Sequence, residues 1–195
     1  MSTHIFALCQ AADLRAMEAT FRQKLLLLLC SETRAHFPDM DFDDESMQVL
    51  TNRLIVLLNK STDQDSITRL ERVMSDLRST LLSLFDTFPG PMEVPVKAIS
   101  AWCLSLAKHA HHIFVTTRET YVTGSPESAV TLLGRTGALY TYIRGELGVK
   151  LHWGDPSKDL TVIGTEIGKI FHAWKSPKIV EVLVGVLAGQ EGKVA

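Results

Sequence analysis

The apolar residues of segment 67–88 recur at alternating steps of three and four residues. They are Ile67, Leu70, Met74, Leu77, Leu81, Leu84 and Phe88. This spacing places them on one face of an α-helix, where nearly three heptads form a coiled-coil-like seam. The seam therefore predicts a long helix that must bury one side against another helix.

Helical periodicity also runs through most of the remaining chain. Stripes of this kind occur at Leu14, Met17, Phe21, Leu25 and Leu28, at Met47, Leu50, Leu54 and Leu57, at Ile99, Trp102, Leu106, Ala110 and Ile113, and at Leu132, Leu139, Ile143 and Leu147. Two shorter stripes begin at Ile163 and Ile179. Since no window alternates convincingly with a period of two, we predict an all-α protein. The expected architecture is an elongated helical bundle of about six to seven helices.

Turn-forming residues divide these helices. The polar loop 59–65 is short, so the helices on either side are expected to form an antiparallel hairpin. Residues 89–95 begin with Pro89-Gly90-Pro91 and end with Pro95, which predicts a linker. We therefore expect three parts: a long-helix bundle segment with the hairpin over 1–88, the linker 89–95, and a C-terminal helical segment over 96–195.

Composition excludes several classes of protein. The 195 residues are 46% hydrophobic and 22% charged, with a net charge of −2, as expected for a folded soluble domain. This balance gives no electrostatic reason to expect nucleic acid or an anionic membrane as a partner. The apolar run Leu25–Leu29 is far shorter than the roughly 20 residues of a membrane span.

The N-terminus and the cysteines predict a cytoplasmic location. No basic region precedes the first apolar residues, so no signal peptide is expected. Cys9, Cys30 and Cys103 are widely spaced and lie on apolar helical patterns. We interpret them as buried free thiols in a reducing compartment.

The densest cluster of possible metal ligands is His109, His111 and His112. His109 and His112 have the spacing of a helical ligand pair, but no acidic residue stands at a matching step. A polar helix face is therefore favoured over a metal site. The acidic run 39–45 lacks the glycine and the terminal glutamate of a calcium loop, and predicts a solvated loop with a helix cap at Asp43 or Asp44.

Other motifs that could carry chemistry are incomplete. The glycine pairs Gly134/Gly137 and Gly164/Gly168 lack the strand-turn-helix context of a nucleotide loop, and predict helix ends or close helix packing. No serine stands in a nucleophile elbow, and no cysteine has a basic neighbour that would activate it. From the residues alone we predict no catalytic, cofactor-binding or metal-binding residues.

Two motifs nevertheless resemble one known family. The run from Leu8 to Arg15, Leu-Cys-Gln-Ala-Ala-Asp-Leu-Arg, is similar to a helix of the aromatic amino acid ammonia-lyases. The run from Leu139 to Gly148, Leu-Tyr-Thr-Tyr-Ile-Arg-Gly-Glu-Leu-Gly, resembles their C-terminal segment. Gly154, Ile163-Gly164 and the turn at Lys175-Ser176 follow in the order of fungal members. From about Ser31 to Pro126, the chain matches only in helical character.

The resemblance implies an ancestry in phenylalanine, tyrosine or histidine deamination, with phenylalanine favoured by the fungal-type features. The family's electrophile, methylidene-imidazolone, forms from an Ala-Ser-Gly triplet, and this sequence contains no such triplet. In the family the first motif lies well past the catalytic centre, whereas here only six residues precede Ala7. The chain is therefore expected to be the C-terminal part of a lyase, without cofactor and inert by itself.

The motif residues are then expected to have structural roles. Cys9, Gln10, Asp13 and Arg15 would tie their helix to its neighbours, while Tyr140, Tyr142, Arg144 and Glu146 would anchor the C-terminal helices. Tyr140 and Arg144 stand four residues apart, so a stack between them is expected. The family assembles through long helices, which implies self-association or binding to an intact lyase chain. A non-catalytic subunit and an unrelated enzyme that uses the histidine cluster remain as alternatives.

Overall fold

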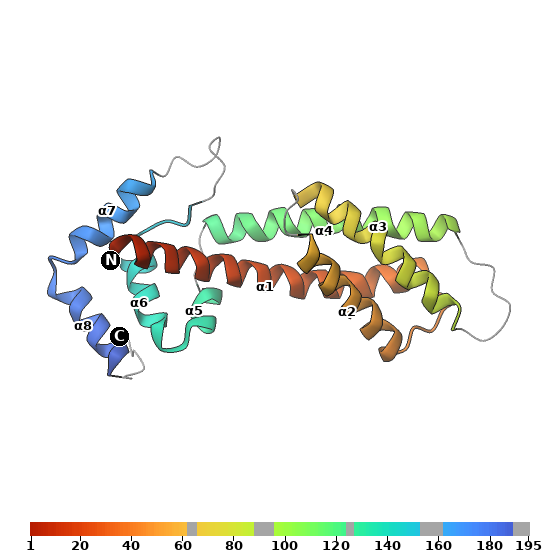
Figure 1. Cartoon of the computed structure of the whole chain (residues 1–195), viewed down its shortest axis with the longest axis horizontal. Helices are drawn as coiled ribbons and strands as arrows, with labels where there is room; N and C mark the ends of the chain where they lie inside the picture. The colour runs from red at the N-terminus through yellow and green to blue at the C-terminus, as the bar shows by residue number, and fades with distance from the viewer. Residues whose placement is uncertain (62–65, 88–95, 124–126, 153–161, 189–195) are drawn as a thin grey trace. The chain divides into compact units, whose positions relative to one another are not determined.

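The computed structural model describes residues 1–61, 66–87, 96–123, 127–152 and 162–188. Figure 1 shows the helices in chain order: α1 (Ser2–His36), α2 (Asp44–Lys60), α3 (Ser66–Phe85), α4 (Val96–Thr123), α5 (Glu127–Leu133), a 3-10 turn η1 (Gly134–Thr136), α6 (Gly137–Thr141), a π-helical turn η2 (Tyr142–Glu146), α7 (Ile163–Ala173) and α8 (Pro177–Leu187). Within these ranges there is no strand. The predicted all-α class is confirmed.

Close contacts group the chain into two compact units. Unit 1 comprises Met1–Thr20 and Thr117–Ala195, and unit 2 comprises Phe21–Thr116. The long helices α1 and α4 each contribute residues to both units. The predicted linker 89–95 lies outside the described residues, so the proposed division at that segment stays a prediction.

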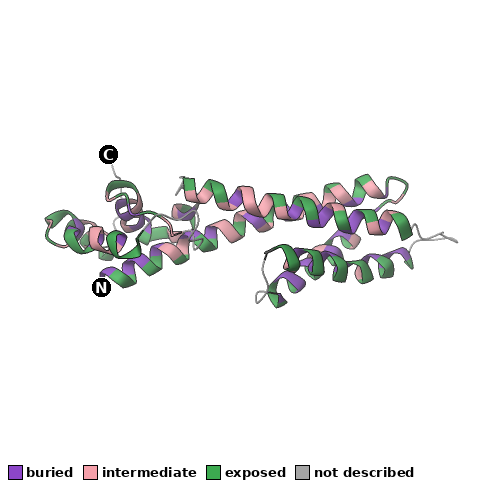
Figure 2. Cartoon of the chain, turned by 90° about the horizontal axis from the view of Figure 1, so that it is seen from above, coloured by how far each residue is buried: buried purple, intermediate pink, exposed green. Residues whose placement is uncertain are grey.

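Unit 2 is built around the predicted seam. Leu70, Met74, Leu77, Leu81 and Leu84 of α3 are all at most 8% exposed, which confirms the helical face they were expected to bury. They share one hydrophobic core with residues of α1, α2 and α4. Figure 2 shows that the helices bury one side and expose the other, as amphipathic helices do. Ile67, the first residue of the seam, is instead half exposed.

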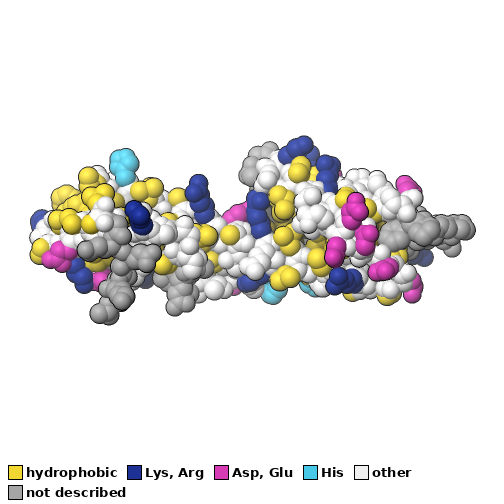
Figure 3. Space-filling view, turned by 90° about the horizontal axis from the view of Figure 1, so that it is seen from below, with side chains coloured by type: hydrophobic (Ala, Val, Ile, Leu, Met, Phe, Trp, Pro, Cys, Tyr) yellow, Lys and Arg dark blue, Asp and Glu magenta, His cyan; other side chains and the backbone are white. Residues whose placement is uncertain are grey.

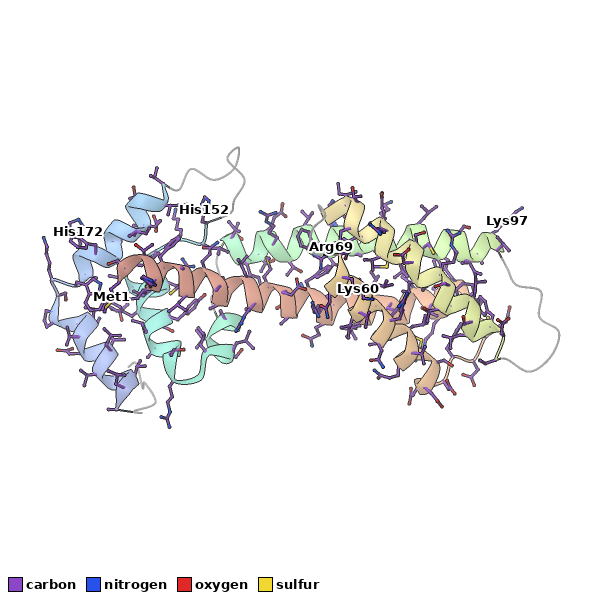
Figure 4. The ribbon with its side chains drawn as sticks, in the orientation of Figure 1. Met1, Lys60, Arg69, Lys97, His152 and His172 are labelled. Atoms are coloured by element: carbon purple, nitrogen blue, oxygen red, sulfur yellow. The ribbon has the colours of Figure 1, made fainter. Side chains whose placement is uncertain are left out.

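Side-chain caps fix the ends of α2. The Asp43 carboxylate accepts a hydrogen bond from the Ser46 backbone N–H at 2.8 Å, as predicted for the N-cap. The Ser46 side chain, together with this backbone bond, holds the pKa of Asp43 below its ordinary value. At the other end, Arg69 of α3 donates to the Leu58 carbonyl at 2.8 Å and to the Ser61 hydroxyl at 3.2 Å. Figure 4 labels Arg69 beside Lys60, the last residue of α2. These bonds occupy acceptors that the helix end leaves open.

Unit 1 has a second core, and the helices after α4 that contribute to it are short. The helix predicted from Leu132 to Leu147, with its first half weakened by Gly134 and Gly137, is divided into α5, η1, α6 and η2. The backbone at Gly134 has a φ of +49°. Gly148 follows η2 with a φ of +59°, the conformation expected of a residue that ends a helix. Ser176 caps α8 and Pro177 occupies its first position, which is the favoured order at a helix start.

No helix among the described residues is both long enough and apolar enough to span a bilayer.

Candidate functional site

The two motifs of the sequence meet at one buried carboxylate in unit 1. Asp13 of α1 is 4% exposed. One of its oxygens accepts a hydrogen bond from the Tyr140 hydroxyl of α6, and the other pairs with the Arg144 guanidinium of η2. Arg144 also donates to the Val149 carbonyl at 3.0 Å. We call Asp13, Tyr140 and Arg144 the Asp13 cluster.

The π-helical turn sets the position of the Arg144 end of the cluster. The Leu147 N–H donates to the Tyr142 carbonyl at 3.0 Å, a five-residue step that widens the helix. Val149 N–H then donates to the Ile143 carbonyl at 3.1 Å and turns the chain back. The turn thus places the Arg144 side chain beside Asp13, whose carboxylate Tyr140 also binds.

Residues 148–152, which follow the cluster, are tied down from two helices. Gln10 of α1 donates to the His152 carbonyl at 2.8 Å and accepts from the His152 N–H at 3.1 Å. Glu166 of α7 accepts from the Lys150 N–H at 2.7 Å. Lys169 bridges the Glu166 carboxylate, at 2.9 Å, to the Gly148 carbonyl at 2.8 Å. The sequence motifs did not predict these partners, although Glu166 and Lys169 have the i, i+3 spacing of a helical ion pair.

The remaining motif residues have varied surroundings. Glu146 pairs with Lys178 of α8, and the Lys178 ammonium lies 5.9 Å from the centre of the Tyr142 ring. Glu146 and Tyr142 thus both contact α8, in agreement with the predicted role as anchors of the C-terminal helices. Cys9 is buried, whereas Arg15 is exposed. The expectation that Arg15 ties α1 to a neighbour therefore finds no contact among the described residues.

Burial shifts the pKa values of Cys9 and Tyr140. It raises the pKa of the Cys9 thiol to about 11, so this thiol is a poor nucleophile at neutral pH. Burial, together with the hydrogen bond to Asp13, also raises the pKa of the Tyr140 hydroxyl. The phenol thus stays protonated and serves as a donor. A carboxylate occupied by two donors and closed off from solvent suits a structural anchor better than proton transfer.

We expect alkaline pH to destabilise the fold through these two groups. The unfolded chain loses the Cys9 proton near the ordinary value of 9.0, whereas the folded chain holds it to about 11. Since the unfolded state then binds fewer protons, stability falls as pH rises through this window, by up to about 2 kcal/mol from Cys9. Urea midpoints followed by circular dichroism between pH 8 and 11 measure the loss.

The Cys9→Ala variant should lose less stability over this range than the unmodified chain does. Cys30→Ala is the control, because Cys30 is only partly buried and lies in unit 2. A Cys9→Ala variant with the same alkaline loss as the unmodified chain would contradict the assignment to Cys9.

The predicted histidine face lies in unit 2. The His109 ring contacts a Glu32 carboxylate oxygen of α1 at 2.8 Å and the Ser105 hydroxyl at 3.3 Å, and His112 is exposed. Across the part of the chain that the structure describes, no three His, Cys, Asp or Glu side chains are grouped to hold a metal ion. His109 therefore joins α4 to α1.

A groove lies in each unit. In unit 1, a groove of about 590 Å³ lies between α1 and the α5–α6 segment, with Leu8, Ala12, Arg15, Leu132 and Leu139 among its lining residues. In unit 2, a groove of about 800 Å³ separates α3 from α4 and is lined by Glu71, Arg78, Cys103, Leu104 and Lys108, among others. Of the predicted glycine contacts, Gly137 packs closely, since an added Cβ would lie 3.3 Å from Val130.

Comparison with known proteins gives one consistent result. The chain is 32% identical over 204 residues to phenylalanine ammonia-lyase str11 of Strobilurus tenacellus, and 28% identical over 197 residues to the phenylalanine/tyrosine ammonia-lyase of Rhodotorula toruloides. Each match covers 96% of this chain but only 28% and 27% of the respective relative. No family model matches the chain.

Solved structures give the same relationship. The crystal structure of phenylalanine ammonia-lyase from Rhodosporidium toruloides superposes with a TM-score of 0.79 at 28% identity. The match covers 95% of this chain and 30% of that one.

Proposed function

The chain is a homologue of the C-terminal part of the phenylalanine ammonia-lyases, and from this relationship we propose that it is a non-catalytic, helical region of such an enzyme. The observation that supports this role most strongly is the Asp13 cluster. Both motifs that resemble the family supply residues to it, and its carboxylate is enclosed and fully engaged. The motifs therefore serve to join α1 to the C-terminal helices.

The chemistry of the family would have to come from residues outside this sequence. Methylidene-imidazolone, the electrophile for the substrate amine, cannot form within this chain because its sequence contains no Ala-Ser-Gly triplet. We assign the conversion of L-phenylalanine to trans-cinnamate and ammonia only to a longer protein or partner that supplies this triplet. The residues of this chain position helices and hold their ends.

We further propose that the chain self-associates through its helices. Exposed apolar side chains on α7 and α8 support this proposal: Phe171, Val180, Val184 and Leu187 are all at least 50% exposed. Surfaces of this kind commonly mark contacts with another protein. The same surfaces favour a second candidate, a subunit that joins an intact lyase chain. The three free cysteines support a cytoplasmic location, where thiols stay reduced.

Activity and assembly can be measured on one preparation. We expect the purified chain to produce no cinnamate from L-phenylalanine, while the intact enzyme of Rhodotorula toruloides does so under the same conditions. Cinnamate formation above the buffer rate would overturn the non-catalytic role. Light scattering during size-exclusion chromatography then tests self-association, and co-elution with the intact enzyme tests the subunit candidate.

A further inference from the structure

The outward face of α8 is an apolar stripe. Val180, Val184 and Leu187 are 50%, 57% and 84% exposed and stand at steps of four and three residues. Ile179, which directly precedes Val180, is fully buried. Since α8 is apolar nearly all round, its outward side has the character of a surface that another helix covers.

The groove of unit 1 is the concave counterpart of this stripe. Its α1 wall presents Ile5, Leu8, Ala12 and Arg15 at helical spacing, and the α5–α6 wall presents Leu132, Leu133, Thr136 and Leu139. Leu8 and Leu132 are 69% and 58% exposed, so the groove is apolar and open. Two helical walls of this pattern accept the apolar stripe of a third helix. Figure 3 shows hydrophobic side chains gathered over the part of the molecule that holds unit 1.

The charges at these two surfaces are complementary. Arg15 is the one charged residue that lines the groove, and it stands at the C-terminal end of the α1 wall. Of the two charged residues of α8, Lys178 pairs with Glu146, while Glu181 is exposed and flanks the stripe at its N-terminal end. An α8 helix that runs antiparallel to α1 would bring Glu181 to Arg15 and Leu187 towards Leu8.

The two lengths also fit. At 1.5 Å per residue, the stripe from Val180 to Leu187 is about 10 Å long, and the α1 wall from Ile5 to Arg15 is about 15 Å long. We infer that the groove of unit 1 binds α8 of a second copy of this chain. A two-fold axis would let each copy insert its α8 into the other, so that two identical contacts form. This inference rests on the proposed self-association and names its surface.

Charge reversal tests the pairing. Arg15→Glu and Glu181→Arg are each expected to raise the dimer dissociation constant roughly tenfold in sedimentation velocity, because each places like charges together. The double variant, Arg15→Glu with Glu181→Arg, should restore the affinity to within about threefold of the unmodified chain. Both positions are exposed, and circular dichroism confirms that each variant stays helical.

Val184→Glu should raise the dimer dissociation constant by more than about a hundredfold, because it places a charge at the centre of the stripe. Leu104→Glu, at a position in unit 2 that is 73% exposed, should leave the affinity unchanged and is the control. A dimer that none of the α8 and Arg15 variants weakens would overturn this surface while self-association stands. Dissociation by Val184→Glu without charge rescue would overturn the groove as the partner of α8. If the unmodified chain is a monomer, both the proposed surface and the self-association are overturned. The non-catalytic role is tested separately, by the activity measurement.

Discussion

Replacement of Asp13 by alanine is expected to lower the free energy of unfolding by about 3–5 kcal/mol. The Asp13 and Arg144 side chains are only 6% and 5% exposed, so the substitution leaves a guanidinium buried without its counter-charge. The Tyr140 hydroxyl loses its acceptor at the same time. Urea denaturation followed by circular dichroism measures the loss.

Asp76→Ala is the control for this prediction. Asp76 also pairs with an arginine, Arg72, but the two atoms are 4.0 Å apart and the side chains are 50% and 64% exposed. Its loss should stay within about 0.5 kcal/mol. Replacement of Asp13 by alanine and Arg144 by methionine together should cost less than the sum of the two single losses, because no charge is then left unpaired. An Asp13→Ala variant as stable as Asp76→Ala would show that the cluster does not anchor the helices.

The second large effect is expected at Trp102, in the core of unit 2. Its side chain is fully buried, and its ring centre lies 6.3 Å from that of Phe37. Its indole N–H donates to the Thr33 hydroxyl at 3.2 Å. Trp102→Ala opens a large cavity and should cost about 3–5 kcal/mol of stability in the same urea measurement.

Two further substitutions on α4 separate packing from hydrogen bonding. Trp102→Phe keeps most of the ring volume but loses the bond to Thr33, so its loss should be roughly 1–2 kcal/mol. Leu104→Ala, two residues along the same helix, removes a side chain that is 73% exposed and should change stability by less than about 0.5 kcal/mol. If Trp102→Ala cost no more than Leu104→Ala, the core of unit 2 would have to be organised differently.

Periodicity predicted helices well, because a helix records its buried side directly in the spacing of apolar residues. The seam from Leu70 to Leu84 and the caps at Asp43 and Ser176 are of this kind. The stripe predicted on the first helix was only partly right. Leu14 is 46% exposed, while Asp13 beside it is buried. The spacing of apolar residues cannot show that Asp13 accepts hydrogen bonds from two donors and is therefore buried on the core-facing side of α1, while Leu14 is exposed.

Contacts between distant residues were beyond the sequence for a physical reason. Tyr140 and Arg144 both bind Asp13, which precedes them by 127 and 131 residues. The expected stack between the two side chains stays a prediction. A polar side chain carries no record of which distant partner it will meet. Nothing in the sequence indicated the bonds between Gln10 and His152, because Gln10 binds the His152 backbone, and nearly every residue type has the same backbone groups.

The sharing of α1 and α4 between the two units has a consequence for how the chain can be taken apart. The chain leaves unit 1 in the middle of α1, at Thr20–Phe21, and returns within the last third of α4, at Thr116–Thr117. Both crossings lie inside continuous helices, where each N–H is bonded four residues back. A protease that needs an extended substrate therefore meets no loop at either crossing. Unit 2 is a continuous stretch of sequence inserted between the two parts of unit 1. Its removal would cut through both α1 and α4 and leave unit 1 with two shortened helices.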